Sequence, residues 1–370
     1  MDELIRFELA GNRQQVGVAT LVREKPLNSL LLETIDRLAE KLNAWLADDG
    51  IACIVLDSSS ERAFCAGADI TVLYDSIQKA GGGNNPHAQA FFLNEYKLDY
   101  ALHTATKPIV VWGNGIVMGG GLGLLGGCSH RIGTPTTRIA MPEITIGLFP
   151  DAGGTKFLSS LPDHLGVFAG LTGCQLAAGD ALELDLLDVV VAPDKKKDIF
   201  TELKALPWGP GKQENARLVT AMLERYRISD RLPVNLLPRR DRITDLMQLC
   251  FEADNFFSAF DSTTGFGDEW LDGAMATYRH GSPTTARIFI EQMRRAKGMS
   301  LADMFRMELV IAYQCIRHPD FPEGIRALLI DKDRKPDWKY KSALDVPDSY
   351  VEAHFRPAWS GTHPLAALDE

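Results

Sequence analysis

The sequence has little of what several large classes of protein require. Lys and Arg number 39 against 49 Asp and Glu, and the formal net charge is −10. Nucleic-acid backbones are held by clustered Lys and Arg, so nucleic acid is not an expected partner. No apolar run is long enough to span a bilayer, so no membrane partner is expected. An anionic small molecule remains compatible, because a local basic patch can act within an acidic protein.

Motifs for metal binding and for two common kinds of catalysis are also missing. The six cysteines form no C-x-x-C pair and the histidines form no H-E-x-x-H motif, so no metal is expected. We interpret the cysteines as buried, reduced thiols. The absence of G-x-S-x-G disfavours a nucleophile-elbow hydrolase. The N-terminus, MDELIRFELA, shows no signal peptide, which predicts a cytoplasmic enzyme.

What is present indicates an α/β protein with a sizeable core. The chain has 370 residues, 45% of them apolar, which suits one large domain with an appendage, or two domains. Apolar runs predict strands over 16–22, 51–57 and 107–117 and two short strands within 131–141. Helices are expected between them, one after Ser29 as N-cap and one over 90–102. This alternation favours parallel strands joined by crossovers.

The character of the sequence changes near residue 200. The segment 195–213 is polar and rich in proline and glycine, and we interpret it as a linker or an excursion of the chain. Beyond it, Ser282 before Pro283 and Ser300 before an apolar run predict two capped helices. We therefore expect an α/β core over 1–200 and a mainly helical region over 201–370.

Two glycine-bearing turns, 63–70 (AFCAGADI) and 113–127 (GNGIVMGGGLGLLGG), each follow a predicted strand. Dense glycine lets the backbone approach a ligand closely and exposes its N–H groups, which can serve as an oxyanion hole. Two alternatives are open. Gly121, Gly123 and Gly126 also fit a dinucleotide-binding G-x-G-x-x-G with Glu143 downstream, although a lone match is a weak signal. The glycines could also serve only a tightly packed helix.

The stretch 139–155, IAMPEITIGLFPDAGGT, places Glu143 and Asp151 in an apolar, glycine-rich run, each directly after a proline. A carboxylate in an apolar site has a raised pKa, which suits a general base or a nucleophile. Other roles are open: Glu143 as a solvated loop acid, and Asp151 as the N-cap of the following helix.

These motifs in this order resemble the enoyl-CoA hydratase/isomerase (crotonase) superfamily, and within it the 3-hydroxyisobutyryl-CoA hydrolases. Supporting stretches are FFLNEYKLDYALHTATKPIV (91–110) and RHPDFPEGIRALLIDKDRKPDWK (317–339). The resemblance covers most of the chain. It implies a crotonase-like spiral of ββα units with a helical C-terminal region, and an acyl-coenzyme A thioester as ligand.

The resemblance also implies roles for particular residues. The Ala68 and Gly120 amides match the two donors of the family's oxyanion hole. Glu95 matches a residue lining the hydrolases' substrate pocket, and Glu143 and Asp151 match their two functional acids, so the substrate-binding set is Glu95, Gly120, Glu143 and Asp151. Hydratases commonly carry a second catalytic glutamate where this chain has Gly123, which disfavours hydration.

We therefore expect a cofactor-free thioester hydrolase that acts on a short branched 3-hydroxyacyl-CoA. The expected substrate is 3-hydroxyisobutyryl-CoA, in valine breakdown, with coenzyme A as part of the substrate. The alternatives are an enoyl-CoA hydratase or isomerase, and a non-enzymatic acyl-CoA-binding protein. Arg23 and Lys25 are candidates for the coenzyme A phosphates, or are solvated surface residues. A homo-oligomer is left open.

Overall fold

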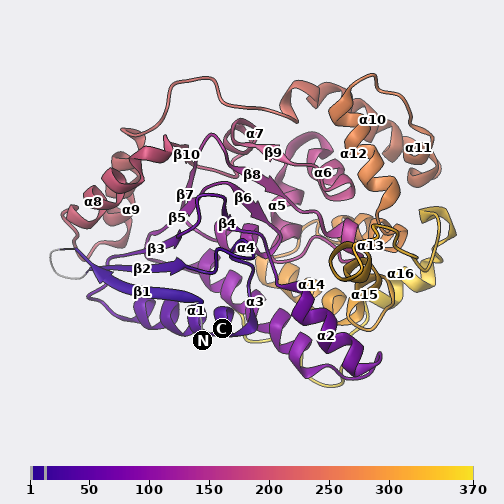
Figure 1. Cartoon of the computed structure of the whole chain (residues 1–370), viewed down its shortest axis with the longest axis horizontal. Coiled ribbons are helices and arrows are strands. Elements are labelled where there is room, and N and C mark those ends of the chain that lie inside the picture. Colours follow the sequence, from indigo (N-terminus) through magenta and orange to yellow (C-terminus); the bar gives the residue numbers. More distant parts are fainter. Residues whose placement is uncertain (1–2, 12–14, 370) are drawn as a thin grey trace. The chain divides into compact units, whose positions relative to one another are not determined.

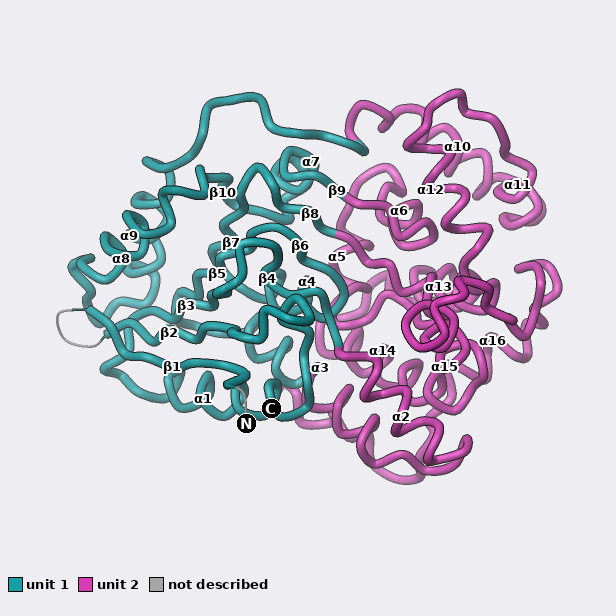
Figure 2. Tube along the Cα trace, in the orientation of Figure 1, with its two compact units in different colours: residues 1–68, 97–139, 176–236 teal, residues 69–96, 140–175, 237–370 magenta. Residues whose placement is uncertain are grey.

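The computed structural model describes residues 3–11 and 15–369. Figure 1 labels the elements. The chain forms two compact units, each built from three separate segments (Figure 2). Unit 1 comprises 1–68, 97–139 and 176–236, and unit 2 comprises 69–96, 140–175 and 237–370. The division at residue 200 that we expected from composition remains a prediction.

Unit 1 contains two sheets. The six-stranded sheet has the order β1-β2-β3-β5-β7-β10. Its strands are β1 (Ile5–Ala10), β2 (Val16–Leu21), β3 (Cys53–Ser58), β5 (Ile109–Gly113), β7 (His130–Gly133) and β10 (Val189–Val190). Only β1 pairs antiparallel; the other neighbours are parallel, as predicted. The four-stranded sheet has the order β4-β6-β8-β9, with β4 (Ala63–Cys65), β6 (Ile116–Met118), β8 (Arg138–Ala140) and β9 (Leu176–Ala177).

Glycine explains why the predicted strand 107–117 is two strands. β5 ends at Gly113 and β6 begins at Ile116 in the other sheet. Between them Gly115 has φ +60°, a conformation that other residues rarely adopt. A Cβ there would lie 2.2 Å from the Arg62 carbonyl oxygen. The chain therefore turns sharply from one sheet into the next.

The helices of unit 1 pack against both sheets. They are α1 (Leu32–Ala47), α4 (Gly120–Gly126), α7 (Ala178–Glu183), α8 (Lys196–Ala205) and α9 (Lys212–Glu224), with η3 (Pro193–Lys195) before α8. Of these, α8 and α9 lie on the larger sheet, and α4 packs against β4 and β6 of the smaller one. The helix expected after Ser29 is α1, which buries Ile35, Leu38, Leu42 and Trp45, but the predicted cap is wrong. The helix begins at Leu32 with Leu31 as N-cap, and Ser29 instead accepts a hydrogen bond from Arg23.

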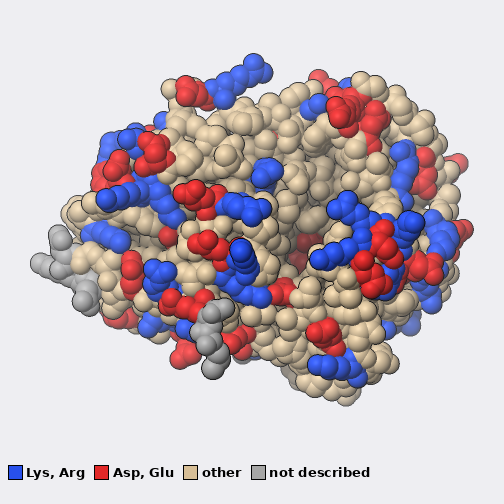
Figure 3. Space-filling model, viewed as in Figure 1, with Lys and Arg blue, Asp and Glu red and all other residues tan. Residues whose placement is uncertain are grey.

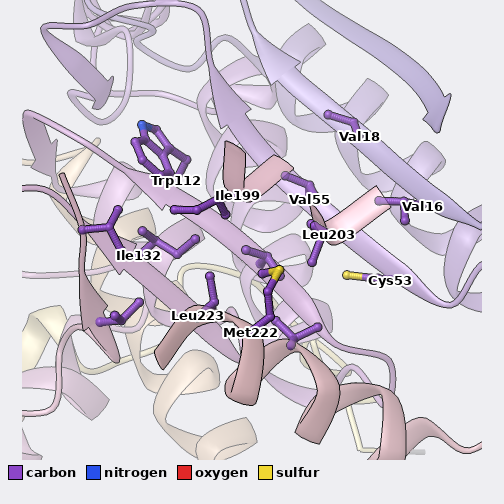
Figure 4. Close-up of a cluster of buried hydrophobic side chains, with 14 residues drawn as sticks. Val16, Val18, Cys53, Val55, Trp112, Ile132, Ile199, Leu203, Met222 and Leu223 are labelled. Carbon is purple, nitrogen blue, oxygen red and sulfur yellow. The ribbon is translucent and has the colours of Figure 1, made fainter. Parts of the chain in front are cut away.

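The interpretation of 195–213 as a linker is also wrong, because α8 occupies its first half and α9 begins at Lys212. Ile199 and Leu203 of α8 are 0% and 1% exposed and join the sheet's apolar core (Figure 4). Few apolar positions mark this helix among its lysines, and burial of those few outweighs the polar composition.

Unit 2 is mainly helical, as predicted for the C-terminal part. Its helices are α2 (Ile70–Ala80), α5 (Gly154–Ser160), α6 (Leu165–Thr172), α10 (Arg240–Glu252), α11 (Phe256–Ser262), α12 (Glu269–His280), α13 (Pro283–Arg295), α14 (Leu301–Cys315), α15 (Asp320–Ile325) and α16 (Asp348–His354). Single turns are η1 (Glu143–Ile146), η2 (Pro162–His164), η4 (Leu237–Arg239), η5 (Arg326–Ile330) and η6 (Ala343–Asp345). α3 (Pro86–Thr104) contributes residues to both units.

Two predicted caps in unit 2 are confirmed. The Ser282 hydroxyl accepts from the Thr285 amide at the start of α13, and the Ser300 hydroxyl accepts from the Asp303 amide at the start of α14. Each satisfies a helix N–H that has no partner within its own helix.

The surface and the cysteines agree with the composition. Acidic and basic side chains are interspersed over the face that Figure 3 shows. All six cysteines are buried, and none forms a disulfide with another cysteine of the described residues, as predicted. No helix in the described part of the chain is long and apolar enough to cross a membrane. Within the same residues no group of three or more His, Cys, Asp or Glu side chains could hold a metal ion.

Candidate active site

In unit 1 the two predicted glycine turns lie against each other. Gly67 has φ +95°, and a Cβ at this position would lie 3.0 Å from the Met118 carbonyl oxygen and 3.5 Å from the Gly120 nitrogen. A Cβ on Gly121 would lie 2.2 Å from the Cys65 carbonyl oxygen. Only residues without a side chain allow the turn 65–68 to approach the start of α4 this closely.

In the described part of the chain, the backbone N–H groups of Ala68 and Gly120 have no acceptor nearby. Gly120 is the first residue of α4, so its N–H has no intrahelical partner. Ala68 forms an isolated parallel bridge with Leu30 in which Leu30 donates to the Gly67 carbonyl. Among the loop hydrogen bonds of residues 3–11 and 15–369, neither the Ala68 nor the Gly120 amide is a donor. Both are therefore available to an external acceptor.

Asn28 stabilises the backbone just before the 65–68 turn. Its side-chain amide is 2% exposed and donates to the Ser58 hydroxyl at 2.7 Å and to the Phe64 carbonyl at 3.1 Å. The turn 25–28, which carries Asn28, thereby holds β4, the strand that leads into the 65–68 turn. The Arg23 guanidinium, a candidate for coenzyme A phosphates, bonds to Ser29, whereas Lys25 is exposed.

In unit 2, Glu143 is the first residue of the turn η1, directly after Pro142. Its side chain is 5% exposed, so it is not a solvated loop acid. Its Oε2 atom is buried and has no hydrogen-bond partner among the residues that the structure describes. An unsatisfied buried carboxylate oxygen is costly, which is typical of a group kept for chemistry.

The turn that carries Glu143 is held by the connection between α12 and α13 and by α15. Ser282 donates its backbone N–H to the Ile144 carbonyl at 2.9 Å and its hydroxyl to Asp320 at 2.7 Å. A Cβ on Gly147, where φ is +72°, would lie 2.4 Å from the Asp320 carbonyl oxygen. The quoted stretch 317–339 therefore packs against the turn of Glu143.

Asp151 lies on the segment between η1 and α5, and its Oδ2 accepts a 2.7 Å hydrogen bond from the Tyr96 hydroxyl. Asp151 is 4% exposed and Tyr96 is 0% exposed. Gln292 of α13 donates to the Pro150 carbonyl at 2.9 Å, which fixes the backbone just before the acid. Asp151 is thus held through both its side chain and its backbone.

Asp151 is not the side-chain cap of α5, because the N-cap residue is Gly153 and no N-cap side chain bonds to the helix. The Gly153 and Thr155 amides instead donate to the two carboxylate oxygens of Glu308, each at 2.9 Å. Glu308 comes from α14 and is 0% exposed. A negative charge at a helix N-terminus is favourable. Glu308 therefore caps the N-terminus of α5, the role that the sequence suggested as an alternative for Asp151.

Burial sets the protonation of these acids. It raises the pKa of Glu143 well above its usual range, and the nearby Asp151 carboxylate raises it further. Burial also raises the pKa of Asp151 to about 7, although the hydrogen bond from Tyr96 opposes this. The pKa of Glu308 rises to about 7 for the same reason, against the lowering effect of its bonds to Thr155 and Gly153. Unit 2 therefore holds two acids, Asp151 and Glu308, that exchange protons near neutral pH, and a third, Glu143, whose pKa burial raises well above its usual range.

Glu95 precedes Tyr96 on α3 and is 2% exposed, so it is not a surface helix residue. Its charge raises the pKa of Tyr96, after burial, Asp151 and Glu308. Sequence reasoning missed Tyr96 and Glu308. A signal for the second was present, because Glu308 is a single acid within the apolar run MELVIAY (307–313).

The model of the enoyl-CoA hydratase/isomerase family matches residues 16–355. The chain belongs to the enoyl-CoA hydratase/isomerase family. The resemblance inferred from the glycine turns and the two acids is thereby confirmed.

Among curated members of this family, two relatives illustrate the similarity. The mitochondrial 3-hydroxyisobutyryl-CoA hydrolase of Gallus gallus is 34% identical over 341 residues, which cover 92% of this chain and 86% of the relative. The Homo sapiens protein of the same name is 32% identical over 340 residues, with the same coverage. Both are described as mitochondrial, so our prediction of a cytoplasmic location is contradicted.

Two solved structures of the family share the fold. A carnitinyl-CoA dehydratase from Mycobacterium thermoresistibile is 32% identical, with a TM-score of 0.82 over 96% of this chain and 97% of the other. An enoyl-CoA hydratase from Rhodobacter sphaeroides 2.4.1 is 29% identical, with a TM-score of 0.81 over 96% of this chain and 98% of the other. The predicted crotonase-like α/β fold with a helical C-terminal region is confirmed.

Proposed function

We propose that the protein hydrolyses 3-hydroxyisobutyryl-CoA to 3-hydroxyisobutyrate and free coenzyme A, which would place it in valine breakdown. The observation that carries this proposal is Glu143, a buried acid with an unpartnered oxygen and a raised pKa. The names of the curated relatives support the choice of substrate. No cofactor takes part in the proposed reaction, and coenzyme A belongs to the substrate.

The proposed reaction uses main-chain donors and two carboxylates. The Ala68 and Gly120 amides donate hydrogen bonds to the thioester oxygen as it becomes negative, a role in which each donor is typically worth on the order of 10² to 10³ in rate. Glu143 either attacks the thioester carbon directly to form a mixed anhydride, which water then hydrolyses, or removes a proton from a water molecule that attacks this carbon. The C–S bond breaks, and coenzyme A leaves as the thiolate.

Asp151 provides the second carboxylate. With a pKa of about 7, it exchanges a proton with water near neutral pH and can orient the water that completes hydrolysis or hold the substrate's hydroxyl. Glu95 is proposed to line the acyl pocket. Tyr96 keeps the Asp151 carboxylate in one orientation through its 2.7 Å hydrogen bond.

A hydratase or isomerase reaction on an enoyl-CoA is the second candidate, favoured by the descriptions of the two solved structures. Hydration needs two carboxylates to hold and activate the water that adds across the double bond. Where hydratases commonly carry the second glutamate, this chain has Gly123, which is buried within α4. This difference favours hydrolysis.

A thiol-trapping assay with 3-hydroxyisobutyryl-CoA tests the proposal. We expect wild-type protein to release free thiol, and Glu143→Gln to lose at least a hundredfold in rate while remaining folded. The matched control is Glu269→Gln, an exposed acid on α12, which should leave the rate unchanged.

Two results would contradict the proposal. One is near-normal thiol release by Glu143→Gln. The other is loss of the enoyl absorbance of an enoyl-CoA substrate with no thiol release from 3-hydroxyisobutyryl-CoA, which would favour the second candidate. Tight binding of the acyl-CoA without either reaction would indicate a non-enzymatic binding protein.

A further inference from the structure

Unit 2 contains a cavity of about 1010 Å³ to which none of the proposed catalytic residues contributes. It is lined by residues of α5, η2, α6, α10, α11, α13 and α14 and by the turn 296–299; Figure 1 labels these α-helices. Pockets that bury most of a small molecule usually measure about 300 to 1,000 Å³. The volume is therefore sufficient for a ligand of substantial size.

The lining is mainly apolar and unusually adaptable. Phe251 and Phe256 contribute rings whose centroids lie 5.0 Å apart, and Phe251 is 45% exposed. Three methionines, Met293, Met299 and Met304, line the same cavity. Methionine side chains are flexible and polarisable, and they are typical of surfaces that accommodate apolar chains of variable shape. The composition fits an alkyl chain better than a rigid polar metabolite.

The charged side chains that line the cavity differ in whether an oppositely charged side chain compensates them. Asp163 is neutralised, because its carboxylate accepts hydrogen bonds from Arg240 at 2.9 and 2.6 Å. Arg294 pairs with Glu291 at 2.6 Å. Lys297 is exposed, and its ammonium group makes no hydrogen bond or ion pair with any residue in the described ranges. The cavity thus carries one uncommitted cation in a protein whose net charge is −10.

We propose that this cavity binds a fatty acid, with the alkyl chain among the methionines and phenylalanines and the carboxylate at Lys297. Apolar surface buried from water drives the chain into the cavity. The uncompensated ammonium selects an anionic head group over a cationic one. This proposal is independent of the proposed hydrolase reaction, because its ligand is neither a thioester nor a substrate for Glu143.

Calorimetric titration of the full-length protein with dodecanoate, below the concentration at which it forms micelles, tests the proposal. We expect saturable binding at one site. Lys297→Glu should weaken it at least tenfold, and Met299→Trp should weaken it similarly by filling the cavity. The matched control is Lys156→Glu, which makes the same charge change at an exposed residue of α5 that does not line the cavity.

The head-group requirement is tested with dodecyltrimethylammonium, which should bind at least tenfold more weakly than dodecanoate. Equal binding of the two amphiphiles, or equal effects of Lys297→Glu and Lys156→Glu, would overturn the proposal. So would displacement of dodecanoate by 3-hydroxyisobutyryl-CoA, since the cavity would then belong to the substrate site. Sedimentation that shows a dimer unable to bind dodecanoate would assign this face to a second copy of the chain. If Met299→Trp does not fold, the dodecanoate titration of Lys297→Glu is sufficient by itself to support or reject the proposal.

Discussion

Glu308 offers a sharp test of how unit 2 holds Asp151. In Glu308→Gln one carboxylate oxygen becomes an NH₂ group, which cannot accept the hydrogen bond that Gly153 or Thr155 donates at 2.9 Å. One buried backbone N–H therefore loses its acceptor. Leaving such a group unsatisfied costs about 1 to 3 kcal/mol, and this cost does not depend on pH.

Ionisation of Glu308 destabilises the wild type but not the glutamine variant. It therefore reduces the stability difference between the two proteins, and this effect depends on pH. Its pKa is raised from 4.5 to about 7. A carboxyl group whose pKa is higher in the folded state stabilises the fold fully below its unfolded pKa, and this contribution is lost as pH rises through the folded pKa. At 1.36 kcal/mol per unit, the loss amounts to about 3 kcal/mol above pH 7. The glutamine variant has no such loss.

We therefore expect a difference in stability that depends on pH. At pH 5 the wild type should be more stable than Glu308→Gln by about 1 to 3 kcal/mol. At pH 8 the difference should vanish or change sign. Urea unfolding followed at several pH values between 5 and 8 measures it, with Glu269→Gln as the exposed control. A stability difference that is the same at every pH would refute the assignment of Glu308 as a buried acid that titrates near neutrality.

Three further predictions concern the residues that position the site. Tyr96→Phe removes the bond that lowers the pKa of Asp151, so the pH profile of thiol release should shift toward higher pH; an unchanged profile would contradict this role. Gly121→Ala places a methyl group 2.2 Å from the Cys65 carbonyl oxygen and should cost about 3 kcal/mol or more in urea unfolding; a fully stable variant would mean that the two turns can separate freely. Asn28→Ala removes buried hydrogen bonds and should destabilise the protein by about 1 to 3 kcal/mol, whereas a change below 0.5 kcal/mol, the usual limit for surface sites, would argue against its supporting role.

Local patterns predicted several elements correctly because each depends on neighbours in sequence. The helical spacing of apolar residues in α1 and the continuous apolar runs in β2 and β3 predict directly which residues are buried. Serine before proline at the start of α13 places a hydroxyl within reach of the Thr285 amide through local geometry alone. The wrong interpretation of α8 as a linker has a related cause, because its local pattern is weak. α8 has only two fully buried apolar residues, Ile199 and Leu203, and a local pattern that sparse does not outweigh polar composition.

The sequence by itself determined the family, the two glycine turns and the two acids, since these are properties of short segments with characteristic residues in a characteristic order. Only the tertiary structure decided which groups hold those acids. Tyr96 and Glu308 lie 55 and 157 positions away from Asp151 in the chain, yet one bonds to its side chain and the other to the amides just after it. Such partners meet only when helices from distant segments pack together, and the same packing removes the water that would otherwise keep the carboxyl pKa values low.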